Sequence, residues 1–400
     1  MKWSLHTPEG TADILCQEAL LRRRTEETIA GVFGGYGYRG VETPIFEFYD
    51  VFANNAGTIA QESMFKFFDE QGRILVLRPD LTTPIARLAA TKLKGEKPPY
   101  RLSYCGNAFR NERETGGAKL REFTQSGIEL IGADHPLSDA EVITATVECL
   151  LAAGLENFQI DIGQVAFFKG LAAQLGLDAE QTEQLREMVD RKNSLAIEEL
   201  VALCDADDAL KALVVSLPSR FGGMEVVDGI DESLLGDTAR SALDNLRQVY
   251  SIIRDYGMES YVSIDLGMVQ SLNYYTGIIF KGFTHGVGYP VCGGGRYDTL
   301  LAEFDAPLSA TGVAIGIDRV VSALMWQKKE VAVQPEITLI ACDNDDRAAA
   351  YVYARTLREE GKTVQMWLDE GSRDDVKNFA KEAGIARVIW VTADGAQELD

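Results

Sequence analysis

The sequence predicts an α+β fold with a helical insertion and a small C-terminal α/β unit. Short β-like runs bounded by turn residues occur along 40–163 and return at 260–292. Between them, residues 166–256 are rich in Ala, Leu, Glu and Arg at helical spacing. Beyond residue 336 strands and helices alternate, which is typical of an α/β unit.

The N-terminal half combines helices with strands that are expected to pair. A double glycine, Gly34-Gly35, ends the first helix, and the turn residues 69–72 join two strands into a hairpin. A polar loop at 114–118 links two long strands, and a long loop of this kind indicates function. The expected elements are helices at 17–36, 83–93 and 136–153, and strands at 40–46, 63–69, 73–78, 100–109, 121–131 and 155–163.

The C-terminal half divides into three parts. We expect one large domain over 1–326 that contains the helical insertion at about 166–256, a linker at 327–335, and a small domain over 336–400. The expected elements are strands at 260–266, 278–281, 288–292, 337–341, 363–368 and 386–391, and helices at 317–326, 347–360 and 373–383.

The charge weighs against one class of function. The 400 residues hold 39 Lys and Arg against 61 Asp and Glu, a formal net charge of −22. Binding to a phosphate backbone needs clustered basic residues that displace counterions. An acidic surface also serves solubility alone, but we expect no nucleic-acid partner.

Cysteine and histidine usage indicates neither disulfides nor metal. The six cysteines lie far apart without a Cys-x-x-Cys pair, and the three histidines are not spaced like zinc ligands. No apolar run approaches the roughly 20 residues of a membrane helix. We therefore expect a cytoplasmic chain with free thiols, no metal, no cofactor and no membrane contact.

One candidate site lies around the polar loop. Arg110 stands at the end of a strand, where its planar guanidinium could hold an anion through two hydrogen bonds. On the next strand, Phe123, Gln125, Gly127 and Glu129 share one face by alternation. A face with both Gln and Glu suits an amine ligand, although a solvated charged hairpin explains the same pattern.

Two further motifs are weak when taken alone. Tyr274 and Tyr275 are expected on a strand, where neighbours point to opposite faces, yet tyrosines also form walls of ligand pockets. The glycines of 293–295 allow either close approach of a backbone or a tight turn. Arg319 falls in the first turn of a helix after Gly316, which could form a second anion site.

Together these motifs resemble one family. From about Pro8 to about Leu324 the chain resembles the histidyl-tRNA synthetase family, which includes the synthetases and the regulatory subunits of short-form ATP phosphoribosyltransferase. Thr43-Pro44, Phe109-Arg110-Asn111-Glu112 and 312–319 look like the three class II synthetase motifs. Segments 272–276 and 292–298 resemble the two segments peculiar to the histidine-specific branch.

Four features favour the regulatory branch. The resemblance places Gln270 where the synthetases carry a catalytic arginine, and loss of such a charge typically costs about 10²–10³ in rate. Arg78-Pro79-Asp80-Leu81-Thr82 differs from the Arg-Pro-Glu-Gly-Thr of synthetases. The last 65 residues, 336–400, are short for an anticodon-binding domain, and they carry eight Lys and Arg against 14 Asp and Glu, a net charge of −6.

The resemblance implies a class II aminoacyl-tRNA synthetase-like antiparallel sheet flanked by helices. It also implies a dimer that assembles with a separate catalytic subunit into a hetero-octamer, activates it and transmits inhibition by histidine. Aminoacylation is expected to be lost. The alternatives are an active histidyl-tRNA synthetase and a stand-alone histidine-binding protein.

The resemblance also implies residue roles. Asp80 and Glu129 would bind the α-amino group of histidine with help from Thr82 and Gln125, and Tyr274 and Tyr275 would contact the imidazole. Arg110 and Arg319 match the synthetases' ATP-binding arginines, and are either vestigial or part of an anion site.

Overall fold

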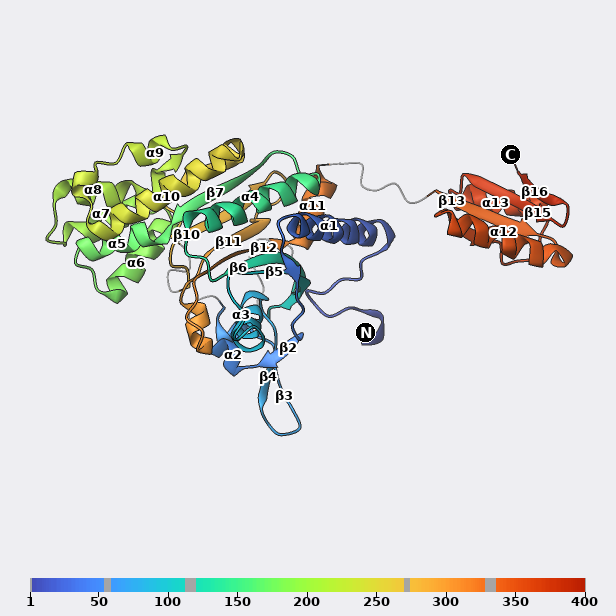
Figure 1. Cartoon of the computed structure of the whole chain (residues 1–400), viewed down its shortest axis with the longest axis horizontal. Helices are drawn as coiled ribbons and strands as arrows, with labels where there is room; N and C mark the ends of the chain where they lie inside the picture. The colour runs from blue at the N-terminus through green and yellow to red at the C-terminus, as the bar shows by residue number, and fades with distance from the viewer. Residues whose placement is uncertain (1, 54–58, 112–119, 270–273, 328–335, 400) are drawn as a thin grey trace. The chain divides into compact units, whose positions relative to one another are not determined.

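The computed structural model describes residues 2–53, 59–111, 120–269, 274–327 and 336–399. The chain divides into two compact units, Met1–Lys329 and Glu330–Asp400, and each is considered by itself (Figure 1). In the described residues, no helix combines the length and the apolar character needed to cross a membrane.

A nine-stranded sheet runs through the described part of the large unit, in the order β1-β5-β6-β12-β11-β10-β7-β9-β8. Neighbouring strands are antiparallel from β5 to β7, whereas β1 pairs with β5 and β9 with β7 in parallel. The strands are β1 (Arg39–Gly40), β5 (Tyr100–Phe109), β6 (Glu122–Ile131), β7 (Phe158–Gln164), β8 (Phe221–Gly222), β9 (Val262–Asp265), β10 (Ile278–Thr284), β11 (Cys292–Arg296) and β12 (Ala310–Gly316).

Helices cover the sheet, as the α+β prediction expects. One layer packs α1 (Cys16–Gly35), α4 (Pro136–Ala152) and α11 (Ile317–Trp326) against the central strands (Figure 1). The expected start of α11 after Gly316 is confirmed. Proline at the first position of α4 is favourable because the N–H that proline lacks would have no partner inside the helix.

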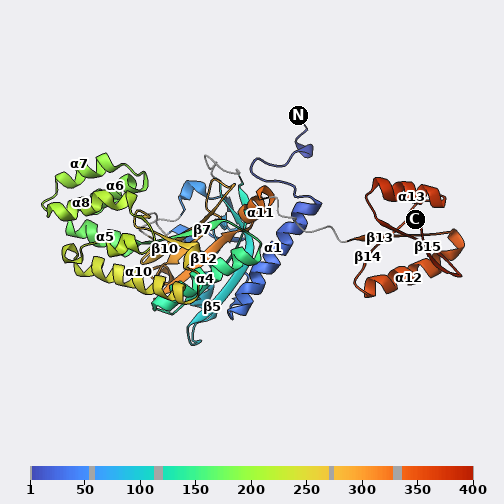
Figure 2. The same cartoon turned by 90° about the horizontal axis from the view of Figure 1, so that it is seen from above.

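Helices follow one another along 165–255, in the segment expected to be helical. Figure 2 shows α6, α7 and α8 gathered at one end of the large unit. Gly170 allows α5 to approach α10, since a Cβ there would lie 2.8 Å from the backbone nitrogen of Ala239. The helices are α5 (Val165–Gln174), α6 (Ala179–Asp190), α7 (Ser194–Ala202), α8 (Asp208–Ser216), α9 (Glu225–Asp228) and α10 (Asp237–Asp255).

A second, three-stranded sheet has the order β2-β4-β3. Its strands are β2 (Phe46–Phe48), β3 (Lys66–Phe68) and β4 (Ile74–Leu77), and the short helix α2 (Asp50–Ala53) follows β2. The antiparallel hairpin of β3 and β4 is confirmed. The single strand expected at 40–46 is wrong, since β1 ends at Gly40 and β2 begins at Phe46 in another sheet. Between the two strands, the backbone carbonyls of Thr43 and Pro44 accept hydrogen bonds from the Arg78 side chain.

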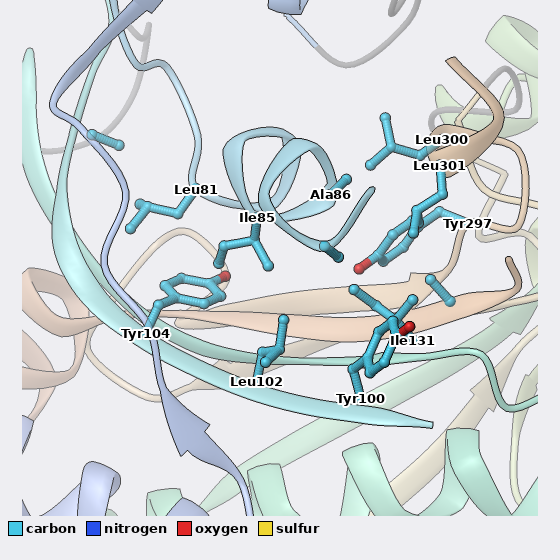
Figure 3. Close-up of a cluster of buried hydrophobic side chains, with 13 residues drawn as sticks. Leu81, Ile85, Ala86, Tyr100, Leu102, Tyr104, Ile131, Tyr297, Leu300 and Leu301 are labelled. Carbon is cyan, nitrogen blue, oxygen red and sulfur yellow. The ribbon is translucent and has the colours of Figure 1, made fainter. Parts of the chain in front are cut away.

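The core that positions the site lies between α3 (Thr82–Lys92) and the sheet. Figure 3 shows Leu81, Ile85 and Ala86 above Leu102 and Tyr104 of β5. All five side chains are buried. Burial of each large apolar side chain contributes about 1.5–3 kcal/mol of stability, and this holds the first turn of α3 against the sheet.

The glycine run of 293–295 is part of β11, so the strand expected at 288–292 is wrong in its position. A Cβ at Gly294 would lie 2.7 Å from the ring of Phe280, and one at Gly295 would lie 2.5 Å from the Ile278 carbonyl. Glycine is therefore required for close approach of β10 and not for a turn.

The small unit is an α/β sheet of four strands, in the order β14-β13-β15-β16, within its described residues. Separate apolar clusters pack α12 and α13 onto the sheet. The pattern of alternating elements predicted this arrangement but missed the last strand. The elements are β13 (Ile337–Cys342), α12 (Arg347–Glu359), β14 (Thr363–Met366), α13 (Arg373–Glu382), β15 (Arg387–Thr392) and β16 (Gly395–Glu398).

Candidate functional site

A cavity of about 460 Å³ opens on the large unit beside the start of α3. Seven of the eight residues predicted for the site line it, and the eighth, Glu129, lies behind its wall. Apolar and small residues from β6, β11, β12 and neighbouring loops complete the lining, together with Lys281 of β10. The predicted residues in the lining are Asp80, Thr82, Arg110, Gln125, Tyr274, Tyr275 and Arg319.

The start of α3 supplies the first acidic group. Asp80 accepts hydrogen bonds from the backbone N–H of Thr83 at 2.8 Å and from the Thr83 hydroxyl at 3.3 Å. These bonds fix the carboxylate at the N-terminus of α3. Burial raises the pKa of Asp80, while the Thr83 N–H and the nearby Arg110 act in the opposite direction. Asp80 is half-buried and lines the cavity, and a carboxylate oxygen that already accepts one hydrogen bond can accept another from a cationic ligand.

The second acidic group, Glu129, lies deeper. Its side chain is 1 % exposed, the Tyr297 hydroxyl donates to Oε2, and Oε1 has no hydrogen-bond partner among the described residues. Burial raises the pKa of Glu129 to about 8, although the hydroxyl groups of Tyr297, Thr82 and Tyr104 act in the opposite direction. An empty cavity at neutral pH therefore favours a protonated Glu129, and a nearby cation would favour its ionised form.

Glycines in β5 and β12 make room for these side chains. Gln125 of β6 is paired with Gly106 on one side and Gly316 on the other, so the space beside it is left to the side chains of Arg78 and Arg319. Glu129 is paired with Gly312, where a Cβ would overlap the carboxylate. The expected shared face of Gln125 and Glu129 is thus built by glycine on the adjacent strands.

Tyr274 and Tyr275 form an aromatic wall, but not in the expected way. They precede β10 and lie outside any strand, so strict alternation does not apply and both line the cavity. Their rings meet edge to face at 4.9 Å, and Tyr274 stacks on Tyr297 at 5.3 Å. The expectation that they lie on a strand and point to opposite faces is wrong, because the chain forms no strand there and turns at Tyr274.

Basic side chains line another part of the cavity. Arg110 stacks over Phe123, with its Nε 3.4 Å from the Pro79 carbonyl oxygen. Arg319 stacks over Tyr289 and donates to the Pro290 carbonyl at 2.8 Å. Lys281 of β10 is the third basic residue of the lining. The cavity therefore combines an acidic end, formed by Asp80 with Glu129 behind it and Arg110 nearby, with a basic end, formed by Lys281 and Arg319.

Sequence reasoning missed Lys281, Tyr297 and Tyr104 as members of the site. Alternation along β10 and β5 places Lys281 and Tyr104 on definite faces, but it does not say which face meets a cavity. The polar loop at 114–118 and Gln270 lie outside the described residues. Over the described ranges no group of three or more His, Cys, Asp or Glu residues could hold a metal ion.

Comparisons with known proteins agree with this architecture. The model of the histidyl-tRNA synthetase family matches residues 10–320. A solved histidyl-tRNA synthetase from Nostoc sp. PCC 7120 superimposes with a TM-score of 0.82 at 21% identity over 97% of this chain and 92% of its own, which shows the shared fold. Fold and cavity define a protein of the histidyl-tRNA synthetase class, and the class II synthetase-like prediction is confirmed.

More similar proteins identify the branch. The ATP phosphoribosyltransferase regulatory subunit of Acetivibrio thermocellus is 49% identical, over 98% of this chain and 94% of the relative. That of Ruminiclostridium cellulolyticum is 39% identical, over 98% and 93%. A solved structure from Bacillus halodurans C, described as an ATP phosphoribosyltransferase regulatory subunit/histidyl-tRNA synthetase, has a TM-score of 0.85 at 31% identity, covering 96% of this chain and 97% of its own.

The chain belongs to the family of ATP phosphoribosyltransferase regulatory subunits. The sequence-based preference for the regulatory branch over an active synthetase is confirmed by these relatives.

Proposed function

We propose that this chain acts with a separate ATP phosphoribosyltransferase catalytic subunit, activating it and conveying feedback inhibition by histidine. That enzyme joins ATP to phosphoribosyl pyrophosphate in the first step of histidine biosynthesis. The observation that carries the proposal is the cavity: it keeps an acidic end and an aromatic wall in a chain whose relatives are regulatory subunits.

Histidine fits the chemistry of the cavity. Its ammonium group matches Asp80, with Thr82 and Gln125 as uncharged hydrogen-bonding partners beside it. The rings of Tyr274 and Tyr275 offer a flat apolar contact and hydroxyl groups for an imidazole. Glu129 supplies a second carboxylate behind this wall, in contact with Thr82.

Regulation requires that histidine bind more tightly to one state of the complex than to another. We propose a dimer of this chain within a hetero-octamer, on the strength of the family resemblance. The small unit has a net charge of −6 over 336–400, which weighs against binding of tRNA by this unit.

The test mixes the full-length chain with a short-form catalytic subunit. We expect stimulated formation of phosphoribosyl-ATP, loss of the stimulation when histidine is added, and no charging of tRNA. A chain that binds histidine but leaves the catalytic subunit unaffected would contradict the proposal and favour a stand-alone histidine-binding protein.

An active synthetase is the second candidate, because Arg110 and Arg319 both line the cavity where the synthetases bind ATP. It predicts histidine-dependent exchange between ATP and pyrophosphate. We expect no such exchange, and a measurable exchange rate in the purified chain would favour the synthetase.

A further inference from the structure

Lys281 stands out among the basic residues of the cavity. It lies on β10 and is half-buried, and its partner across the ladder is Gly293 of β11. A Cβ at Gly293 would lie 3.9 Å from Cγ of Lys281, so the stem of the lysine runs beside an uncovered strip of backbone. Gly293 and Lys281 both line the cavity.

Small residues that pair across neighbouring strands lie between Lys281 and the acidic end of the cavity. Gly127 of β6 is paired with Ala314 of β12, Ala314 with Gly293, and Gly293 with Lys281. Three strand spacings of about 4.8 Å separate the backbones of Gly127 and Lys281, a distance that a ligand and a lysine side chain can bridge together. Gly293 and Ala314 line the cavity, whereas the Tyr104 hydroxyl covers Gly127.

The ammonium group of Lys281 has no hydrogen bond or ion pair to any residue that the structure describes. Burial lowers the pKa of Lys281, and Asp190 and Asp265 only partly oppose this through space. By contrast, Arg319 already donates to a carbonyl at 2.8 Å. A half-buried ammonium whose charge Asp190 and Asp265 only partly offset is unfavourable, and an anion in the cavity would lower that cost.

The nearby acidic residues do not explain Lys281. Asp161 stands opposite it on β7, but accepts a hydrogen bond from the Ser263 hydroxyl. Asp265 accepts from the backbone N–H of Gly267 at 2.8 Å. Both carboxylates thus have partners of their own.

We propose that Lys281 binds the carboxylate of a free amino acid whose ammonium group lies at the acidic end of the cavity. The inference rests on the proposed function and deepens it: the site selects a zwitterion. Ligands without the carboxylate, such as the corresponding amino alcohol, lose this contact. Lys281 is then the residue that distinguishes free histidine from derivatives that lack the carboxylate.

The test compares L-histidine with L-histidinol, which keeps the imidazole and the amine but has a hydroxymethyl group in place of the carboxylate. Calorimetry on the full-length chain should show that Lys281→Met weakens the binding of L-histidine by about tenfold to a hundredfold, which is the usual contribution of a charge-assisted hydrogen bond. The affinity for L-histidinol, already weaker in the unaltered chain, should not change. Lys281→Arg should restore most of the preference for L-histidine.

Lys66→Met is the matched control, because Lys66 lies on β3 over the ring of Tyr49 and outside the cavity lining. Equal losses for both ligands in Lys281→Met, or no loss for L-histidine, would overturn the inference. A loss of affinity in Lys281→Met that is confined to inorganic pyrophosphate would also overturn the inference, since the bound oxyanion would then be a phosphoryl group. Failure of the unaltered chain to bind histidine would overturn the histidine part of the proposed function together with this inference.

Discussion

The acidic and basic ends of the cavity are built differently. Asp80 and Glu129 accept hydrogen bonds from Thr83 and Tyr297, and Glu129 is buried behind a wall of tyrosines. Lys281 lies on bare backbone with no such partner among the described residues. A carboxylate held by hydrogen bonds is pre-organised for one geometry, whereas a lysine on a flexible stem adapts to its ligand. Under our proposal, the acidic end fixes the position of the ligand and the basic end tests its charge.

The largest expected difference between the two ends comes from glycine substitutions. In Gly312→Ala the new Cβ would overlap the Glu129 carboxylate and lie 2.6 Å from the Ile128 carbonyl oxygen. We expect a loss of about 3 kcal/mol in the free energy of unfolding, as for overpacked cores. Urea denaturation measures it.

Gly293→Ala is the matched substitution at the basic end, where the nearest atom to the new Cβ is 3.8 Å away. Its unfolding free energy should change by about 0.5 kcal/mol or less. Similar losses in both variants would show that the two ends are equally packed.

Asp80→Asn tests the contact with the ligand's ammonium group. Asparagine can still accept the Thr83 N–H at the start of α3 but carries no charge. Calorimetry should show histidine binding about tenfold to a hundredfold more weakly. Asp69→Asn, in the turn after β3, is the control. Unchanged affinity in both Asp80→Asn and Glu129→Gln would remove the acidic end from the site.

The buried Glu129 predicts a dependence of stability on pH. Its pKa rises from 4.5 to about 8 on folding, so between these values the unfolded chain has lost a proton that the folded chain keeps. Stability from this group therefore falls as pH rises, by at most about 1.4 kcal/mol per pH unit, and levels off above about pH 8.

Glu129→Gln should abolish this contribution while keeping an acceptor for the Tyr297 hydroxyl. The measurement is urea unfolding of both chains between about pH 5 and pH 8. Parallel curves would show that Glu129 is ionised in the folded chain.

Arg110→Gln should have the smallest effect. Arg110 opposes the rise in the pKa of Asp80, but it is half-buried and already stacked on Phe123. Histidine affinity should fall by about twofold to fivefold. A loss as large as that of Asp80→Asn would make Arg110 a direct ligand contact.

Local patterns predicted much of the fold. The turn residues 69–72 placed the β3–β4 hairpin, and alternation put Gln125 and Glu129 on one face of β6. Local patterns failed where contacts between distant chain segments decide the structure. Glycines 293–295 suggested a turn or a close approach, and the neighbouring β10 settled which, because it leaves no space for a side chain at Gly294 and Gly295.

By itself the sequence determined the order of elements, the acidic charge of the small unit and the motifs of the histidine-specific branch, since these depend on local spacing and composition. Only the tertiary structure decided that Tyr297 donates to Glu129, 168 residues earlier in the chain, and that Lys281 faces the cavity. The physical reason is that strand pairing and burial create these neighbours, and both depend on contacts between segments far apart in the chain.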